Sequence, residues 1–403
     1  EFQDFNPLEV AFIDELEKKG PILIVGDDDQ AIYDDRFASP EHLRKKFRSG
    51  QYETFQLPFC SRCPEVIVEA TNSVIDFAKK NGALEGRISK PYKCYLADKV
   101  VENIKYPKII VSQCANAITI TKYVDKVISK IDKDEILESW EGGKEYPTVL
   151  IVGSKQYLTK IEKELKAKYP QMKYTKPSGK NEYNLSDGYE QLLKVKDSNL
   201  GWRILAEIFL DGKTFESILK ETTKGTPMVE LLDDEFLSVH RRIVALIQEG
   251  KEKGELTMKV RRSIKSKIGS EYADVISHFF PTEEEEIQID KTKPSILLTS
   301  FKGCKGLSAG HVIIVGANNG SIPIDPHDVK DVEIGQFIVA LTRTRKQCHI
   351  VSNKWLYSPK DSEGNWITAF EPTGFLNLIP AKFINDLGYL KAEQVKCTSQ
   401  DII

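Results

Sequence analysis

The chain has 403 residues, of which 40% are hydrophobic and 29% charged, and its formal net charge is −3. This length predicts two or three domains, and the mixture is typical of globular proteins with sizeable cores. The composition excludes a wholly basic nucleic-acid coat, although a local groove can still be positive. No run approaches the roughly 18 consecutive apolar residues of a membrane-spanning helix.

The first predicted elements are a helix, a strand and a polar loop. Residues Pro7–Lys19 place Leu8, Phe12 and Leu16 four apart, which predicts an amphipathic helix. The apolar run Pro21–Gly26 predicts a buried parallel strand. The acidic sequence that follows would then lie at the carboxyl end of this strand, where open α/β sheets bind ligands.

Five further apolar runs predict buried strands: Ile109–Val111, Thr148–Val152, Ser295–Thr299, Val312–Val315 and His349–Ser352. Helical patterns lie between several of them, which predicts a doubly wound α/β sheet. From about Lys176 to Glu286 only helical patterns remain, such as Glu190–Leu210 and Asp233–Gln248. We interpret this stretch as a helical insertion between two halves of one α/β domain, with Glu283–Glu286 as a solvated linker.

The seven cysteines are scattered without a disulfide framework. An odd number in a chain of this length indicates a reducing compartment, and we expect a cytoplasmic protein. Cys60 and Cys63 have C-x-x-C spacing, but a zinc site needs about four ligands and no second pair follows. We therefore interpret this pair as incidental.

Two polar motifs near the start contain the residue types of a nucleotide site. These are EFQD at Glu1–Asp4 and GDDDQAIYDDR at Gly26–Arg36. An acidic residue there can hold Mg²⁺ or position an attacking water, and a glutamine can contact a γ-phosphate. The four-residue motif alone is weak and favours a polar chain end, whereas the longer string is specific.

Taken in order, these motifs resemble motifs II and III of UvrD/Rep/PcrA-like superfamily 1 DNA helicases. LPFCSRCPEVIVEATNSVI (Leu57–Ile75), SFKGCKGLSAGHVIIVGANNGSIP (Ser300–Pro323) and IVALTRTR (Ile338–Arg345) resemble motifs IV, V and VI. The resemblance covers about Glu1 to Asn353, and the helical stretch falls where this family inserts a subdomain.

The resemblance implies an α/β, RecA-like doubly wound parallel sheet with a helical insertion subdomain. Residues 1–52 would be the C-terminal remnant of a first RecA-like domain. Residues 53–175 and 291–375 would be the two halves of a second RecA-like domain, interrupted by a helical insertion at 176–290. The tail, 376–403, carries no readable motif and predicts only a short helix.

The resemblance also implies a nucleotide site with six residues: Glu1, Gln30, Arg62, Lys305, Gly306 and Arg343. Glu1 matches the general base for the attacking water, and Gln30 matches the glutamine near the γ-phosphate. Arg62 and Arg343 match two arginine fingers, a task that suits guanidinium groups because charge accumulates on phosphoryl oxygens. A surface ion pair is the alternative interpretation for each arginine alone, and an ordinary strand-to-helix turn is the alternative for the glycine-rich motif V.

Candidate DNA contacts are Tyr33, Arg36, Phe37, Lys302, Arg261 and Arg262. Lys302 stands in place of the motif V histidine, and Phe37 follows Asp35, where the family often has a DNA-stacking tryptophan. The two remaining arginines belong to the basic segment Lys251–Lys267, which we interpret as a face that contacts the nucleic-acid backbone. A solvated helix face is the alternative interpretation.

The sequence departs from the family pattern at several points. It contains no G-x-x-x-x-G-K-[ST] phosphate loop, and the first residue, Glu1, lacks the aspartate that precedes it in motif II. We expect a cut end, so that ATP and Mg²⁺ need a missing upstream region and the chain alone hydrolyses ATP poorly. Ser61 replaces an adenine-stacking tyrosine, and Ser308 replaces a ribose-contacting glutamate.

These observations favour part of an ATP-dependent helicase that moves 3′ to 5′ along single-stranded DNA and acts at DNA junctions. The alternative is a non-catalytic nucleic-acid- or protein-binding module with a degenerate helicase fold, which Ser61 and Ser308 favour slightly. A helicase–nuclease subunit would need a carboxylate–lysine cluster, and the residues after Phe375 show no such pattern.

Overall fold

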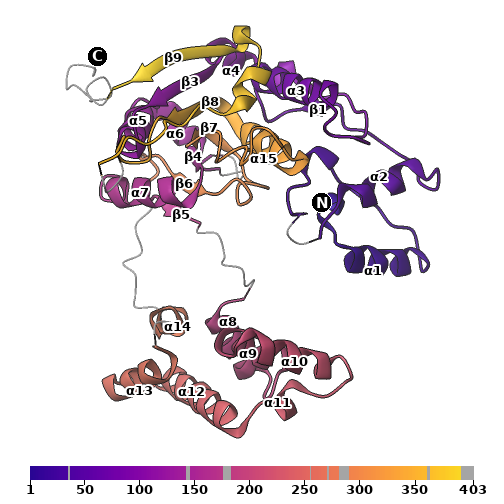
Figure 1. Ribbon diagram of the computed structural model, residues 1–403, viewed down its shortest axis with the longest axis vertical. Coiled ribbons are helices and arrows are strands. Elements are labelled where there is room, and N and C mark those ends of the chain that lie inside the picture. The colour runs from indigo at the N-terminus through magenta and orange to yellow at the C-terminus, as the bar shows by residue number, and fades with distance from the viewer. Residues whose placement is uncertain are drawn as a thin grey trace. The chain divides into compact units, whose positions relative to one another are not determined.

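The computed structural model describes residues 1–34, 37–141, 146–175, 183–254, 256–269, 272–280, 290–360 and 364–391. The chain divides into two compact units, drawn in Figure 1. Unit 1 contains Glu1–Pro177 and Ile289–Ile403, and unit 2 contains Ser178–Gln288. Each unit has its own hydrophobic core, so each is described by itself.

Unit 1 is built on a seven-stranded sheet with the order β5-β6-β4-β7-β8-β3-β9, and every neighbouring pair is parallel. Its strands are β3 (Ile109–Cys114), β4 (Val149–Val152), β5 (Lys173–Tyr174), β6 (Ile296–Thr299), β7 (Ala309–Val315), β8 (Thr344–Asn353) and β9 (Ile384–Leu390). The predicted α/β class with a large parallel sheet is confirmed, and the five later predicted strands correspond to β3, β4, β6, β7 and β8. A separate pair of short strands joins β1 (Phe59–Cys60) to β2 (Lys93–Cys94).

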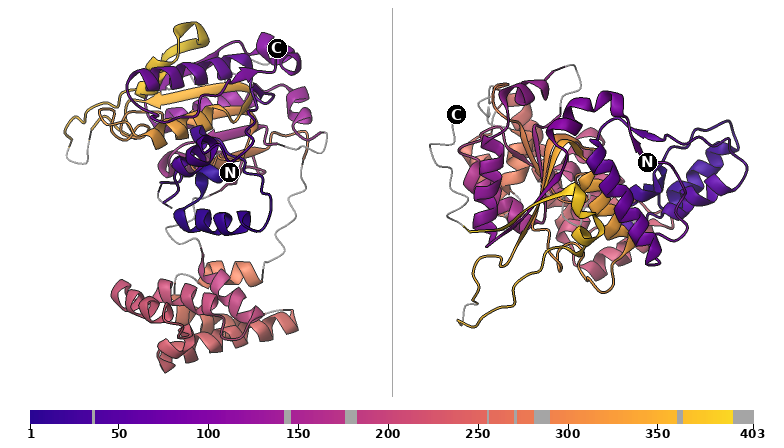
Figure 2. Two further views of the ribbon diagram at one scale, coloured as in Figure 1. Left: turned by 90° about the vertical axis from the view of Figure 1, so that its right-hand side faces the viewer. Right: turned by 90° about the horizontal axis from the view of Figure 1, so that it is seen from above.

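Helices cover both faces of this sheet (Figure 2). Those of unit 1 are α1 (Pro7–Glu17), α2 (Pro40–Arg48), α3 (Glu65–Lys80), α4 (Val100–Lys105), α5 (Ala117–Ser129), α6 (Lys133–Glu138), α7 (Lys155–Leu165) and α15 (Asp331–Leu341). In β7, Val312 and Ile314 belong to the core under α3 and α15, whereas Ile313 and Val315 belong to the core under α5 and α7. This alternation explains why the run Val312–Val315 is apolar without interruption: the strand is buried on both faces.

The predicted strand at Pro21–Gly26 is wrong. These residues have no regular secondary structure, and Leu23 and Val25 are 90% and 59% exposed. The Val25 carbonyl oxygen accepts hydrogen bonds from the backbone nitrogens of Glu1 and Phe2, and Ile24 packs against a small cluster that contains Phe2 and Leu43. A parallel strand exists only beside partner strands, and the described residues provide none here.

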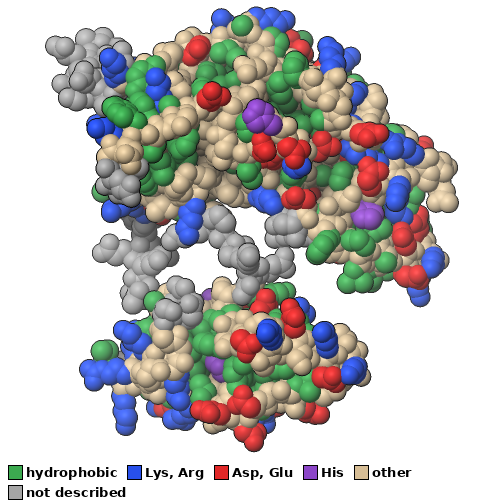
Figure 3. All heavy atoms as spheres, in the orientation of Figure 1, with side chains coloured by type: hydrophobic (Ala, Val, Ile, Leu, Met, Phe, Trp, Pro, Cys, Tyr) green, Lys and Arg blue, Asp and Glu red, His purple; other side chains and the backbone are tan. Residues whose placement is uncertain are grey.

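The helix predicted at Pro7–Lys19 is confirmed as α1, but its apolar face is not covered. Asn6 caps it by accepting hydrogen bonds from the backbone nitrogens of Leu8 and Glu9. Leu8 and Phe12 are 80% and 64% exposed, and Figure 3 shows hydrophobic side chains on this surface. Periodicity therefore predicts the helix correctly without showing what packs against it.

The tail contains a strand, β9, in place of the short helix that the sequence predicts. It lies beside β3 and extends the sheet, after 3-10 turns at Gly374–Leu378 and Ala381–Phe383. Its sequence, INDLGYL, is rich in residues that strands usually avoid. It forms through pairing with a strand that is distant in the sequence, a signal absent from local composition.

Unit 2 is helical. It contains α8 (Leu185–Lys194), α9 (Asn199–Phe209), α10 (Gly212–Thr222), α11 (Met228–Leu231), α12 (Asp234–Lys253), α13 (Met258–Ile268) and α14 (Tyr272–Phe279). The helical pattern at Glu190–Leu210 is two helices, because the backbone is extended at Val195. The predicted linker Glu283–Glu286 lies outside the described residues. Among the described helices, none has the length and apolar character to cross a membrane.

The core of unit 2 contains a buried histidine that should make its stability depend on pH. His240 is 3% exposed and hydrogen-bonds through Nδ1 to the Tyr189 hydroxyl at 2.8 Å. Burial, and then the charge of Lys267, lower the pKa of His240 to about 4 from 6.5. The unfolded chain therefore binds more protons between these two values, so stability is full above about pH 6.5 and falls as the pH drops.

We expect this loss to reach at most about 1.4 kcal/mol per pH unit. It can be measured as the urea midpoint of the helical circular dichroism signal between pH 7 and pH 5. His240→Gln retains a side-chain hydrogen-bond acceptor and should flatten the pH dependence, whereas His278→Gln, at a half-exposed histidine of the same unit, should not. An equal slope in all three proteins would contradict the assignment.

Candidate nucleotide site

Residues that are far apart in the sequence of unit 1 meet at Gln30. The loop before it forms a 3-10 turn, Asp28–Gln30, which Asp27 caps. The side-chain oxygen of Gln30 accepts a hydrogen bond from Arg343 Nη2 at 3.4 Å, and its backbone oxygen accepts one from Lys305 Nζ at 2.6 Å. The structure therefore brings together three of the residues that the sequence assigns to the site.

Lys305 also joins the first residues of the chain to this cluster. Its ammonium pairs with the Asp4 carboxylate and lies 3.4 Å from Glu1 Oε2. Burial raises the pKa of Asp4 above its usual value despite the Lys305 charge. Partial burial alone would raise the pKa of Glu1. Lys305 and Gln3 outweigh this effect, so the pKa of Glu1 is lowered. Gly306, the next residue, has a φ of +78°, a conformation that favours glycine.

Two guanidinium groups contact Thr342, Arg62 at its carbonyl oxygen and Arg343 at its hydroxyl. Arg62 Nη1 donates to Thr342 O at 3.3 Å, and Arg343 is the next residue. Arg343 is 2% exposed, and its side chain donates to Val339 O and Leu307 O at 2.8 and 3.2 Å. Burial and the neighbouring Arg62 charge lower the pKa of Arg343.

Within the described part of the chain, neither of these two arginines has an ion pair with a carboxylate. Two like charges therefore lie close together, one of them buried, without a compensating negative charge. A bound anion relieves such an arrangement, and a guanidinium group matches the geometry of a phosphate. The ion-pair alternative for Arg62 and Arg343 is wrong for the described residues.

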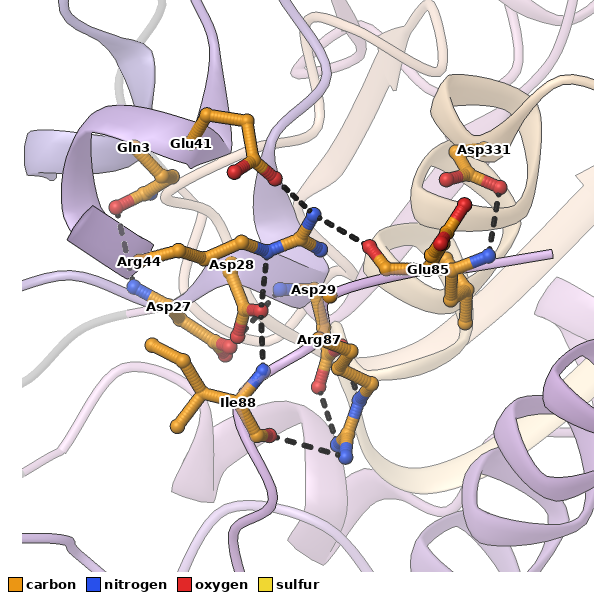
Figure 4. A network of polar contacts seen from close by, with 12 residues as sticks. Gln3, Asp27, Asp28, Asp29, Glu41, Arg44, Glu85, Arg87, Ile88 and Asp331 are labelled. Atoms are coloured by element: carbon orange, nitrogen blue, oxygen red, sulfur yellow. Dashed lines mark hydrogen bonds and ion pairs between the residues drawn. The ribbon is translucent and has the colours of Figure 1, made fainter. Parts of the chain in front are cut away.

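The three acids Asp27, Asp28 and Asp29 lie close enough to resemble a metal site, but cations already occupy them. Asp28 pairs with Arg44 at 3.0 Å, Asp29 pairs with Arg87 at 2.6 Å, and Lys90 contacts all three acids. Figure 4 shows how this network ties the loop to the segment around Ile88. The cluster does not fit Mg²⁺. The acidic run was visible in the sequence, but its three basic partners carried no local signal.

Among the predicted DNA contacts, Tyr33 and Lys302 lie together. The Tyr33 hydroxyl donates to Lys302 O at 3.3 Å, and its ring lies under the Lys305 ammonium, 5.3 Å from the centroid. Phe37 is 82% exposed and has a φ of +59°. Arg36 lies outside the described residues.

The other two predicted DNA contacts are on α13 in unit 2. Arg262 is exposed, whereas Arg261 is half-buried and donates through Nε to Leu256 O at 3.2 Å. These contacts do not distinguish a DNA-binding face from a solvated helix face, and the assignment stays a prediction.

The two serines that replace nucleotide contacts differ in their surroundings. Ser61 is exposed. Ser308 Oγ accepts a hydrogen bond from Arg345 Nε at 3.0 Å, and this arginine also lies 4.5 Å from the ring centroid of Tyr146. A serine therefore orients a neighbouring arginine where the family has a carboxylate.

The seven-stranded parallel sheet with helices on both faces (Figure 2) defines an α/β protein. Residues 1–49 match the UvrD/REP helicase N-terminal domain family. The chain is also 34% identical over 111 residues to the protein named DNA helicase II of Haemophilus influenzae. That match covers 26% of this chain and 15% of the relative. The predicted resemblance to UvrD-like helicases is therefore confirmed.

Proposed function

We propose that this chain is part of an ATP-dependent DNA helicase of the UvrD-like type, which couples ATP hydrolysis to 3′-to-5′ movement on single-stranded DNA in the cytoplasm. Residues 53–175 and 291–375 would form its second RecA-like domain, with a helical insertion subdomain at 176–290. Residues 1–52 would belong to the first RecA-like domain. Single-stranded DNA and DNA junctions are the proposed substrates.

The observation that carries this proposal is the pair Arg62 and Arg343, which lack carboxylate partners in the described chain. When ATP is bound, its γ-phosphate supplies the negative charge that this pair lacks. Both guanidinium groups would then stabilise charge that develops on the phosphoryl oxygens. Gln30, already hydrogen-bonded to Arg343, would report the state of that phosphate to the loop at Asp27–Asp29.

The same site lacks two parts of a complete motor. The 403 residues contain no phosphate loop, and the Asp27–Asp29 cluster is neutralised by cations. We therefore propose that the chain alone hydrolyses ATP poorly and that ATP and Mg²⁺ binding need further sequence. Glu1 would act as general base only when its carboxylate leaves Lys305, because that ammonium holds it ionised and weakly basic.

The deciding measurement is ATP hydrolysis by the product of the complete reading frame, with and without single-stranded DNA. We expect DNA to stimulate hydrolysis strongly, and strand displacement to require a 3′ single-stranded tail. No hydrolysis, with DNA binding retained, would support the alternative: a binding module with a degenerate helicase fold. The observation in favour of that alternative is that Ser308 binds Arg345 in place of a ribose-contacting carboxylate.

A further inference from the structure

The C-x-x-C segment lies at the arginine site, between a strand and a helix. Cys60 ends β1, and Pro64 forms the N-cap of α3. Cys63 is fully buried, whereas Cys60 is half-buried. Arg62, one of the two unpaired arginines, lies between these cysteines in the sequence. The pair is therefore part of the surroundings of Arg62.

The surroundings of the two sulfur atoms are unequal. The backbone nitrogen of Cys63 donates to Cys60 Sγ at 3.4 Å, and the Tyr92 hydroxyl also hydrogen-bonds to this sulfur. The interaction with the Cys63 side chain lowers the pKa of Cys60. Burial acts in the opposite direction but has the smaller effect. The same interaction and complete burial raise the pKa of Cys63. This asymmetry is that of an attacking thiolate beside a resolving thiol.

The Cys63 thiol is also connected to the arginines. Its sulfur lies 3.3 Å from Thr342 O, the same oxygen that accepts from Arg62 Nη1 at 3.3 Å. The Cys63 thiol therefore donates to the carbonyl oxygen that Arg62 also contacts. Oxidation of Cys63 removes its thiol proton and therefore this hydrogen bond to Thr342 O. Thr342 directly precedes Arg343, so the change occurs next to the second arginine.

A third thiol, Cys94, lies next to the pair. It is the register partner of Cys60 in the β1–β2 ladder, and its Sγ donates to Cys63 O at 3.4 Å. Burial raises the pKa of Cys94, so it is the weaker nucleophile of the two half-buried thiols. Among the described residues, these sulfurs do not form a group tight enough to hold a metal ion. The geometry therefore favours sulfur–sulfur chemistry over zinc.

We propose that Cys60 and Cys63 form a reversible dithiol–disulfide site that reacts with low-molecular-weight disulfides of the glutathione class and adjusts the position of Arg62. The Cys60 thiolate attacks one sulfur of the small disulfide, forming a mixed disulfide and releasing one small thiolate. Cys63 then loses its proton to solvent and attacks Cys60 Sγ. The internal disulfide forms as the second small thiolate leaves, so two cysteine thiols are oxidised and one small disulfide is reduced.

The test is to incubate the chain with graded ratios of reduced and oxidised glutathione, quench with acid, alkylate, and map the peptides by mass spectrometry. We expect a Cys60–Cys63 disulfide that dithiothreitol reverses. Cys63→Ala should stop the reaction at a glutathione adduct on Cys60. Cys94→Ser is the matched control and should leave the disulfide unchanged. Iodoacetamide should alkylate Cys60 at least about tenfold faster than Cys94 at pH 7.

Two outcomes would overturn the proposal: a Cys60–Cys94 disulfide as the main product, or a Cys60 thiol that stays free while other cysteines react. Thermal melts of each variant establish that it is folded.

The effect on hydrolysis rests on the proposed function and is measured separately on the complete gene product. There, oxidation should lower hydrolysis about fivefold, as expected for one lost hydrogen bond, in the wild type and in Cys94→Ser but not in Cys60→Ala, which lacks the attacking thiolate. If the gene product does not hydrolyse ATP, the proposed function fails while the peptide map still decides the disulfide.

Discussion

Replacing Arg343 by alanine in the complete gene product should lower DNA-stimulated ATP hydrolysis by about 10³-fold or more. An arginine that reaches the transferred phosphoryl group contributes about 10³- to 10⁵-fold to the rate. Arg343 is suited to this role because it is 2% exposed, hydrogen-bonded to Gln30, and without a carboxylate partner in the described chain. Steady-state hydrolysis at saturating DNA measures the effect.

The same side chain also has structural contacts, so the comparison needs controls. Arg343 donates to Val339 O and Leu307 O, and its removal leaves both carbonyls without this donor. Arg343→Lys retains the positive charge but not the planar fork, and should also be strongly impaired while staying folded. Arg345→Ala removes a neighbouring arginine that binds Ser308, and should have a much smaller effect. Hydrolysis by a folded Arg343→Ala protein within threefold of wild type would refute the arginine-finger assignment.

The sequence predicted the sheet where burial alone determines the pattern. β4, β6 and most of β7 are apolar because helices cover both faces, and such runs are recognisable without knowledge of their partners. The two errors have the opposite cause. Residues 21–26 are apolar but lie outside any sheet, and β9 is polar but pairs with β3. In both cases distant neighbours, not local composition, determine the structure.

The candidate site was also predicted only in part from the sequence. Gln30, Lys305 and Arg343 are predicted from their motifs, and the structure brings them together. The motifs do not reveal that Arg44, Arg87 and Lys90 neutralise the acidic run, because these residues occupy no recognisable pattern. The C-x-x-C pair was visible in the sequence, but its contact with Thr342 depends on folding. Motifs therefore indicate which residues meet, whereas charge balance appears only in three dimensions.

The acidic run leads to the prediction with the largest effect on stability. Asp28→Ala should destabilise unit 1 by about 3–5 kcal/mol, because removing one partner of a buried ion pair leaves buried Arg44 with only the half-exposed Glu41 as a carboxylate partner. The Asp28 side chain is fully buried and accepts hydrogen bonds from Arg44 Nε at 3.0 Å and from the Ile88 backbone nitrogen at 2.8 Å. Urea unfolding measures the loss. Hydrogen exchange of a peptide covering residues 85–90 should accelerate because the Ile88 amide loses its acceptor.

We expect the loss of stability in Asp28→Ala to depend on burial of the ion pair, and control variants test this. Asp328 pairs with Lys330 at the surface, where both side chains are more than 60% exposed, so Asp328→Ala should change stability by less than about 1 kcal/mol. Arg44→Met combined with Asp28→Ala should recover part of the loss, because the buried guanidinium that has lost Asp28 is then also removed. Burial raises the pKa of Asp28, but Lys90 and the other donors outweigh this and leave it below its usual value. The stabilisation is therefore present above about pH 4 and lost in acid, so the Asp28→Ala difference should shrink as the pH falls through that range. An equal loss at Asp28 and Asp328 would mean that the acidic run is an ordinary surface feature and does not hold the Gln30 loop in place.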